Sequence, residues 1–329
     1  MLGTVVAVEL FMHMPGFWEY ELLSREYDYK RTFEASSASA PGIAPVIAAV
    51  GSSRTQYAMI PTSIEERLDL QRGQVTNLGF SAGTPQDYVN LYAKYPSAFD
   101  NLDVLLVEVG AYSYNWTVLI SGERNDRFRR YSSLSDRLAV PGISKKIDYA
   151  AGAVLRSWDA RALLRVVLKR VGSLQEPIRL TSDSRGQIDV LDLSERGADP
   201  QDASAQPHEW DFLDYKFSEY QLEKIVKFVR TAQNAGVSVV LIEPPLSPLF
   251  VDEVNEHYST EDNMWRNRVS EAVGLPIISI DRSKSMCSDW RDCYYDYGHM
   301  NPIGAESFSL AIADYLTANN LITSSVTAP

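Results

Sequence analysis

Short apolar runs recur along the chain, and stretches with helical character separate them. We expect strands at residues 45–50, 74–78, 104–109, 237–242 and 276–280. We expect helices at residues 62–70, 222–235, 263–273 and 305–319. Strands without polar alternation are typical of a parallel sheet that helices cover on both faces. The sequence therefore predicts an α/β fold with three layers, α/β/α, around a mainly parallel sheet.

The alternation stops between residues 114 and about 215. Apolar side chains at helical spacing predict one or two amphipathic helices over residues 142–171. Residues 177–207 are polar and acidic and are expected to form a long loop. We interpret the whole stretch as a helical insertion into the α/β domain, with a role as a lid, in substrate binding or at a membrane.

The net charge is unevenly distributed. The chain carries −12 overall, which argues against a nucleic-acid partner because like charges repel the phosphate backbone. Residues 121–172 hold twelve basic and five acidic residues, so this segment carries +7 and the remainder −19. One interpretation is contact with an anionic membrane surface or polymer. The other, which we favour, is a solvated helix face held against the acidic body.

The N-terminal residues and the cysteines bear on location. Residues 1–12 are apolar apart from Thr4 and Glu9 but lack the basic region and cleavage site of a signal peptide. They are consistent with the remnant of a membrane anchor or with a buried helix or strand, so we separate residues 1–40 from a domain over 41–329. Cys287 and Cys293 flank a polar, turn-like loop. A disulfide there would indicate an oxidising compartment, and reduced thiols are the alternative.

Three short segments near strand ends or before a helix carry residues suited to nucleophilic catalysis. Gly51 allows a sharp turn that exposes a serine at the carboxyl end of the first strand, although such a serine also commonly caps a helix. Asp296 and His299 stand three residues apart before the last helix, so the carboxylate can orient the imidazole as a general base. The small residues of segment 77–84 leave backbone N–H groups able to approach an oxyanion, or form a simple turn.

The order of these segments resembles the SGNH (GDSL-like) hydrolase superfamily. Gly51-Ser52-Ser53 is similar to the Gly-Asp-Ser block of the family, and Asp296 with His299 matches its Asp-x-x-His block. The resemblance covers about residues 44–112 and 216–318. It implies Ser53 as the nucleophile, with Ser52 as the remaining alternative, and it implies a triad with His299 and Asp296.

Two other blocks depart from the family pattern. The family's oxyanion-donor glycine falls on Ala82, which can still donate through its backbone. The third block matches the strand and Gly110, but Tyr112 replaces the usual asparagine, and Asn115 is the candidate substitute. Such looser blocks resemble the branch of alginate and cell-wall O-acetylation proteins. That branch implies work outside the cytoplasm, in the periplasm or at the cell surface, with an N-terminal membrane tether and an acyl-donor membrane protein as a partner.

The resemblance implies acyl transfer through a covalent intermediate on Ser53, as an O-acetyltransferase or an acetylesterase of a cell-surface or exported glycan. No metal or cofactor is expected because the triad supplies both base and nucleophile, and four scattered histidines with two cysteines argue against a zinc site. The alternatives are a catalytically silent polysaccharide-binding or scaffolding protein and a lipid-directed acyl hydrolase that docks through residues 121–172.

Other residues near these segments are candidates for substrate binding. Arg54 is expected either to hold an anionic substrate group or to pair locally. Glu243 ends a strand beside the same crevice. Aromatic side chains shortly before His299 suit sugar stacking, or a packed loop. They are Trp290, Tyr294, Tyr295 and Tyr297.

Overall fold

The computed structural model describes residues 42–120, 122–155, 209–212, 214–280 and 290–322. Contacts divide the chain into two compact units. One contains the described residues from Leu119 to Leu155, and the other contains the described residues before and after them. None of the helices in the described ranges has the length and apolar character needed to cross a lipid bilayer. The predicted segment 1–40 and the predicted loop 177–207 lie outside the described residues.

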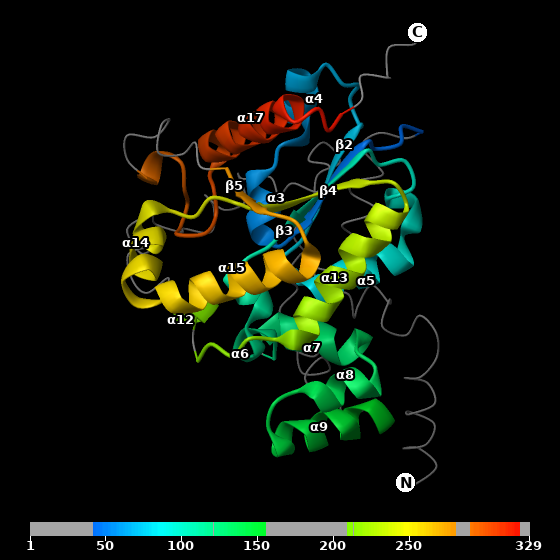
Figure 1. Ribbon diagram of the computed structural model, residues 1–329, viewed down its shortest axis with the longest axis vertical. Coiled ribbons are helices and arrows are strands. Elements are labelled where there is room, and N and C mark those ends of the chain that lie inside the picture. Colours follow the sequence, from blue (N-terminus) through cyan, green and yellow to red (C-terminus); the bar gives the residue numbers. More distant parts are fainter. Residues whose placement is uncertain (1–41, 121, 156–208, 213, 281–289, 323–329) are drawn as a thin grey trace, which may run out of the picture. The chain divides into compact units, whose positions relative to one another are not determined.

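The larger unit is built on a five-stranded parallel sheet with strand order β2-β1-β3-β4-β5 (Figure 1). The strands are β1 (Ile47–Gly51), β2 (Val75–Gly79), β3 (Val104–Glu108), β4 (Ser238–Glu243) and β5 (Ile277–Ser279). Every residue of β1, β2 and β3 is buried, as expected for strands covered on both faces. The predicted α/β fold and its parallel sheet are confirmed, and each strand lies within about a residue or two of its predicted position.

Helices cover the two faces of this sheet in two groups (Figure 1). The first group comprises α3 (Ser53–Ala58), α4 (Pro61–Leu68) and α17 (Pro302–Ala318), and the second comprises α5 (Pro85–Lys94), α13 (Glu219–Asn234) and α15 (Ser259–Val273). The resulting three-layer α/β/α arrangement is the predicted one. Two helices were not predicted from the sequence, α5 and α14 (Pro248–His257). Each begins with a proline in its first turn after a threonine or serine.

The loop that carries Asp296 and His299 is anchored in the core between the sheet and α17. The buried side chains of Cys293, Tyr294 and Met300 belong to that core. Tyr294 and Met300 pair across the loop, and the Tyr295 N–H donates to the His299 carbonyl at 2.9 Å. Both ends of the loop are therefore fixed before α17 begins. Cys293 is disulfide-bonded, while Cys287 lies outside the described residues.

The two ends of the predicted insertion lie side by side in the sheet unit. Asn115 pairs with Phe217 in an antiparallel bridge, and the Ser218 N–H donates to the Tyr114 carbonyl at 2.7 Å. Tyr114 is buried and stacks on Phe217 and on Trp265. Residues on both sides of the predicted insertion thus lie together in the sheet unit. After this junction, α6 (Trp116–Leu119) leads towards the smaller unit.

The described part of the smaller unit contains α7 (Gly122–Tyr131), α8 (Leu134–Ala139) and α9 (Ile143–Val154). The predicted amphipathic helix over 142–171 is confirmed as far as α9, and residues from 156 onward lie outside the described ranges. Arg137 is 1% exposed, and its guanidinium donates to the Tyr149 and Arg129 carbonyls. Arg129 forms an ion pair with Asp148. Part of the positive charge of segment 121–172 therefore holds these helices together.

Candidate active site

The first candidate segment forms the turn from β1 into α3. Ser52 is the N-cap of α3, because its Oγ accepts a hydrogen bond from the Arg54 N–H at 3.0 Å. Ser53 is consequently the first residue of the helix, at the carboxyl end of β1. A Cβ at Gly51 would overlap the Thr55 hydroxyl and the Glu108 carboxylate. Glycine is therefore required here by the close approach of those groups.

Ser53, His299 and Asp296 form a hydrogen-bonded chain. Ser53 Oγ lies 2.8 Å from His299 Nε2, and His299 Nδ1 lies 2.8 Å from Asp296 Oδ2. These are the contacts that a serine nucleophile, a general base and an orienting carboxylate require. The fold brings together residues that are 246 positions apart in the chain. Ser52 is turned inward instead, with 2% exposure and its Oγ donating to Glu108 at 2.6 Å.

The Asp296 carboxylate also fixes its own loop. Its Oδ1 accepts the backbone N–H groups of Gly298 and His299, each at 2.8 Å. Burial by itself would raise the pKa of Asp296, but attraction to the His299 imidazole and these hydrogen bonds outweigh it and lower the pKa below its ordinary value. Tyr57 packs edge-on against the His299 ring at 5.1 Å between centroids. The imidazole is thus held on two sides.

The lowered pKa of Asp296 predicts a pH-dependent contribution to stability. A carboxyl group with a folded-state pKa below its ordinary 3.8 stabilises the fold above that pH, and the contribution is lost as the pH falls through the folded-state value. We therefore expect the difference in Tm between the wild type and Asp296→Asn to shrink as the pH is lowered from 7 to below 3.8. Thermal unfolding across that range measures it, and a difference independent of pH would contradict the prediction.

Glu108 is a buried hydrogen-bond acceptor that was not predicted from the sequence. It lies beneath the turn from β1 into α3, residues 51–55, which we call the nucleophile turn. It ends β3 and is 1% exposed. Its carboxylate accepts the Ser52 N–H at 2.7 Å, the Thr55 N–H at 3.1 Å, and the hydroxyls of Ser52, Thr55 and Tyr112. The available signal was a single acidic residue inside an otherwise apolar strand.

The residues of the third block surround that carboxylate. Tyr112 is 3% exposed, and burial raises the pKa of its phenol. Tyr112 is therefore a neutral donor to Glu108. A Cβ at Gly110 would lie 2.9 Å from the Tyr112 ring, so the glycine permits this packing. Asn115 is buried at the insertion junction, where its side chain donates to the Asp211 carbonyl at 3.2 Å. Its predicted role towards an oxyanion stays a prediction.

The turn after β2 packs against the end of β1. The Phe80 N–H donates to the Gly51 carbonyl at 3.2 Å, and a Cβ at Gly83 would overlap that same carbonyl. Ala82 lies in this turn with a positive φ of 56°. The structure therefore places the segment predicted to supply an oxyanion donor beside the nucleophile turn. Among the described residues, the Ser53 N–H has no acceptor.

Arg54 lines a pocket beyond the carboxyl end of β4. Its guanidinium is 2.8 Å from Asp211 and is 4.9 Å from the Tyr112 ring centroid. Burial alone would lower the pKa of Arg54, but Asp211 and other neighbouring acidic groups raise it. Arg54 therefore lines the pocket as a permanently charged side chain that is ion-paired with Asp211. A Cβ at Gly298 would lie 3.2 Å from its Nε, so the same side chain also packs against the loop that carries His299.

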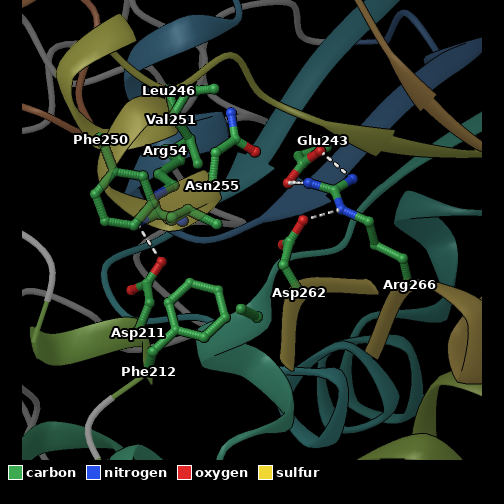
Figure 2. Close-up of a pocket in the computed structure, with 12 residues that line it drawn as sticks. Arg54, Asp211, Phe212, Glu243, Leu246, Phe250, Val251, Asn255, Asp262 and Arg266 are labelled. Atoms are coloured by element: carbon green, nitrogen blue, oxygen red, sulfur yellow. Dashed lines mark hydrogen bonds and ion pairs between the residues drawn. The ribbon is translucent and has the colours of Figure 1, made fainter. Parts of the chain in front are cut away.

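The opposite wall of the pocket carries a second ionic group (Figure 2). Arg266 donates twice to Glu243, at 2.6 Å each, and once to Asp262 at 2.8 Å. Burial raises the pKa of Glu243, and the pairing with Arg266 opposes that rise. The pocket thus combines two arginine–carboxylate groups with an apolar lining. The apolar residues are Ala111, Phe212, Leu246, Phe250, Val251 and Val254.

The aromatic residues before His299 occupy different places. Tyr294 is 1% exposed and belongs to the core. Tyr297 stacks on the pocket residue Phe250 at 5.5 Å between ring centroids. Tyr295 is half-buried beside its backbone bond to His299, and the side chain of Trp290 lies outside the described part of the chain. Within the described residues, Tyr297 thus contacts the pocket through Phe250, and the Tyr294 hydroxyl donates to the carbonyl of the pocket residue Leu246 at 3.2 Å.

No protein-family model matches the chain, and no curated protein matches it. Within the described ranges, no group of three or more histidine, cysteine or acidic residues is placed to hold a metal ion. The chemical assignment of the site therefore rests on its own geometry, above all on the contacts of Ser53, His299 and Asp296.

Proposed function

We propose that the protein is a serine-dependent acyl-ester enzyme. The observation that carries the proposal is the hydrogen-bonded chain from Ser53 Oγ through His299 to Asp296. In the reaction, His299 Nε2 takes the hydroxyl proton while Ser53 Oγ attacks the ester carbonyl carbon. The Asp296 carboxylate accepts a hydrogen bond from the His299 Nδ1–H, orients the ring and stabilises the imidazolium that forms. His299 then returns the proton to the departing alkoxide, which leaves an acylated Ser53.

The developing oxyanion needs donors that point at it before the reaction begins. In this proposal the backbone N–H groups of Ser53 and Ala82 supply them. The absence of an acceptor for the Ser53 N–H among the described residues, and the packing of the Ala82 turn on the end of β1, support that assignment. Tyr112 leaves no asparagine in the third block, so the backbone donors carry more of this stabilisation.

The acyl acceptor decides between the two forms of the activity. Water as the acceptor gives an esterase, and a sugar hydroxyl gives an O-acetyltransferase. The resemblance to SGNH hydrolases of the O-acetylation branch favours a glycan outside the cytoplasm as the substrate. The pocket beside Arg54 supports the same proposal, because it offers ring faces and paired polar groups near the triad loop.

The proposal is tested by trapping the acyl-enzyme. Wild-type protein is incubated with p-nitrophenyl acetate or a fluorophosphonate, and intact mass followed by peptide mapping locates the adduct. We expect one adduct per chain, on Ser53. Adding neutral or acidic oligosaccharides to the acetate reaction then separates the two activities, because a transferase yields acetylated sugar. A wild-type protein that neither labels nor releases p-nitrophenol would contradict the enzyme proposal and leave the polysaccharide-binding alternative.

A further inference from the structure

We infer that Glu108 is a positioning residue for the nucleophile: its carboxylate fixes the backbone on both sides of Ser53 and leaves the Ser53 N–H as the turn's donor to substrate. The inference rests on the proposed function, because it assigns a role within that same site. Glu108 is 56 residues from Ser52 in the chain and reaches the turn only because β1 and β3 are neighbours in the sheet.

One carboxylate oxygen brackets Ser53. Glu108 Oε2 accepts the N–H of Ser52 at 2.7 Å and the N–H of Thr55 at 3.1 Å. The same oxygen accepts the Thr55 hydroxyl, and the other oxygen accepts the hydroxyls of Ser52 and Tyr112. All five partners are N–H or O–H donors, which is the arrangement that suits a carboxylate. Rotation of the turn that moved Ser53 Oγ away from His299 would break several of these bonds together.

The same network determines which N–H of the turn stays available. The first N–H groups of a helix have no partner within the helix itself. Here the Ser52 and Thr55 N–H groups go to Glu108, and the Arg54 N–H goes to the Ser52 hydroxyl that Glu108 orients. Of these four consecutive N–H groups, that of Ser53 alone has no acceptor among the described residues. The donor left over belongs to the nucleophile itself.

Two departures from the SGNH pattern meet at this carboxylate. Ser52 stands where the family's first block has aspartate, and Tyr112 stands where its third block has asparagine. Both side chains donate to Glu108. The carboxyl group that is missing at position 52 thus reaches the turn from β3. Ser52 and Tyr112 therefore belong to one hydrogen-bonded network with Glu108. In this inference the network replaces the two family side chains together.

A merely structural role for Glu108 is the competing explanation, and the chain offers a matched control. Glu65 is also a buried carboxylate, 3% exposed, that accepts two backbone N–H groups, those of Gly73 at 2.7 Å and Val75 at 2.9 Å. These two bonds hold the turn into β2, at the opposite end of the strands from the nucleophile turn. Glu65→Ala therefore removes comparable buried bonds without touching the residues that flank Ser53.

The test compares Glu108→Ala, Glu108→Gln and Glu65→Ala by p-nitrophenyl acetate kinetics, fluorophosphonate labelling rate and Tm. We expect Glu108→Ala to lower kcat and the labelling rate by about 10²-fold, with KM changed little, because the turn loses its alignment. Glu108→Gln keeps an oxygen for the two N–H groups, and its amide can donate to hydroxyls that rotate to accept. It is expected to restore kcat to within about tenfold of the wild type. Glu65→Ala is expected to lower Tm while kcat stays near the wild-type value.

The inference is overturned if Glu108→Ala keeps wild-type kcat and labelling, or if Glu65→Ala loses as much activity as Glu108→Ala. Should Glu108→Ala not be recovered folded, Thr55→Val and Tyr112→Phe each remove one donor from the carboxylate. Each is then expected to lower the labelling rate, and unchanged rates would refute the inference. A wild-type protein that never labels refutes the proposed function first, so the two failures are distinguishable.

Discussion

Replacing either Ser53 or His299 by alanine is expected to lower kcat/KM for p-nitrophenyl acetate by about 10⁴-fold or more, because each removes a whole step of the acyl-transfer mechanism. Without the Ser53 hydroxyl no covalent intermediate forms. Without the His299 imidazole, whose Nε2 lies 2.8 Å from that hydroxyl, nothing accepts the proton as the carbonyl is attacked. Steady-state hydrolysis, with intact-mass detection of the acyl-enzyme, measures both effects.

The double variant tests whether the two residues act as one unit. Members of a triad are grossly non-additive, so Ser53→Ala/His299→Ala should be no slower than either single variant. His257→Ala and Ser259→Ala, which change an exposed histidine and an exposed serine, serve as controls and should keep wild-type rates. Independent losses that multiply in the double variant, or a Ser53→Ala protein that still forms the acyl-enzyme, would contradict a shared mechanism.

The parallel sheet was predictable because its strands are apolar on both faces. A run such as Val104–Glu108 can be buried this way only between two layers of helices. The first residues of the helices were harder to predict from the sequence, because capping interactions determine where a helix begins. For example, α13 begins at Glu219, three residues before its predicted start, since the Ser218 hydroxyl accepts the Gln221 N–H. The helix propensities of the residues did not indicate where α13 begins, whereas the capping serine at position 218 marks its start.

The candidate site was predictable where its residues are close in sequence. Asp296 and His299 share one loop, and their spacing already permits the hydrogen bond that the structure contains. The choice between Ser52 and Ser53 was not accessible, because it depends on Glu108, which lies on another strand. The partner of Arg54 was inaccessible for the same reason: Asp211 is 157 residues away, near the end of the predicted insertion.

Asp296→Asn should lower kcat by about 10³- to 10⁴-fold while leaving the site's geometry nearly intact. The Asp296 Oδ1 accepts the N–H groups of Gly298 and His299, and the asparagine oxygen can keep both bonds. Its amide NH₂ then faces His299 Nδ1. Because that amide donates, Nδ1 must accept, and the ring proton moves to Nε2. An imidazole protonated at Nε2 cannot accept the Ser53 proton.

This substitution separates orientation from chemistry. The loop of Asp296→Asn keeps its backbone hydrogen bonds. We therefore expect only a small decrease in Tm at neutral pH and little change in KM, while kcat falls strongly. Asp292→Asn, an exposed position in the same segment, is the matched control and should keep wild-type kcat. If Asp296→Asn retained more than about a tenth of wild-type kcat, the tautomer argument would fail. The carboxylate would then be a loop-holding group, and His299 would act without its help.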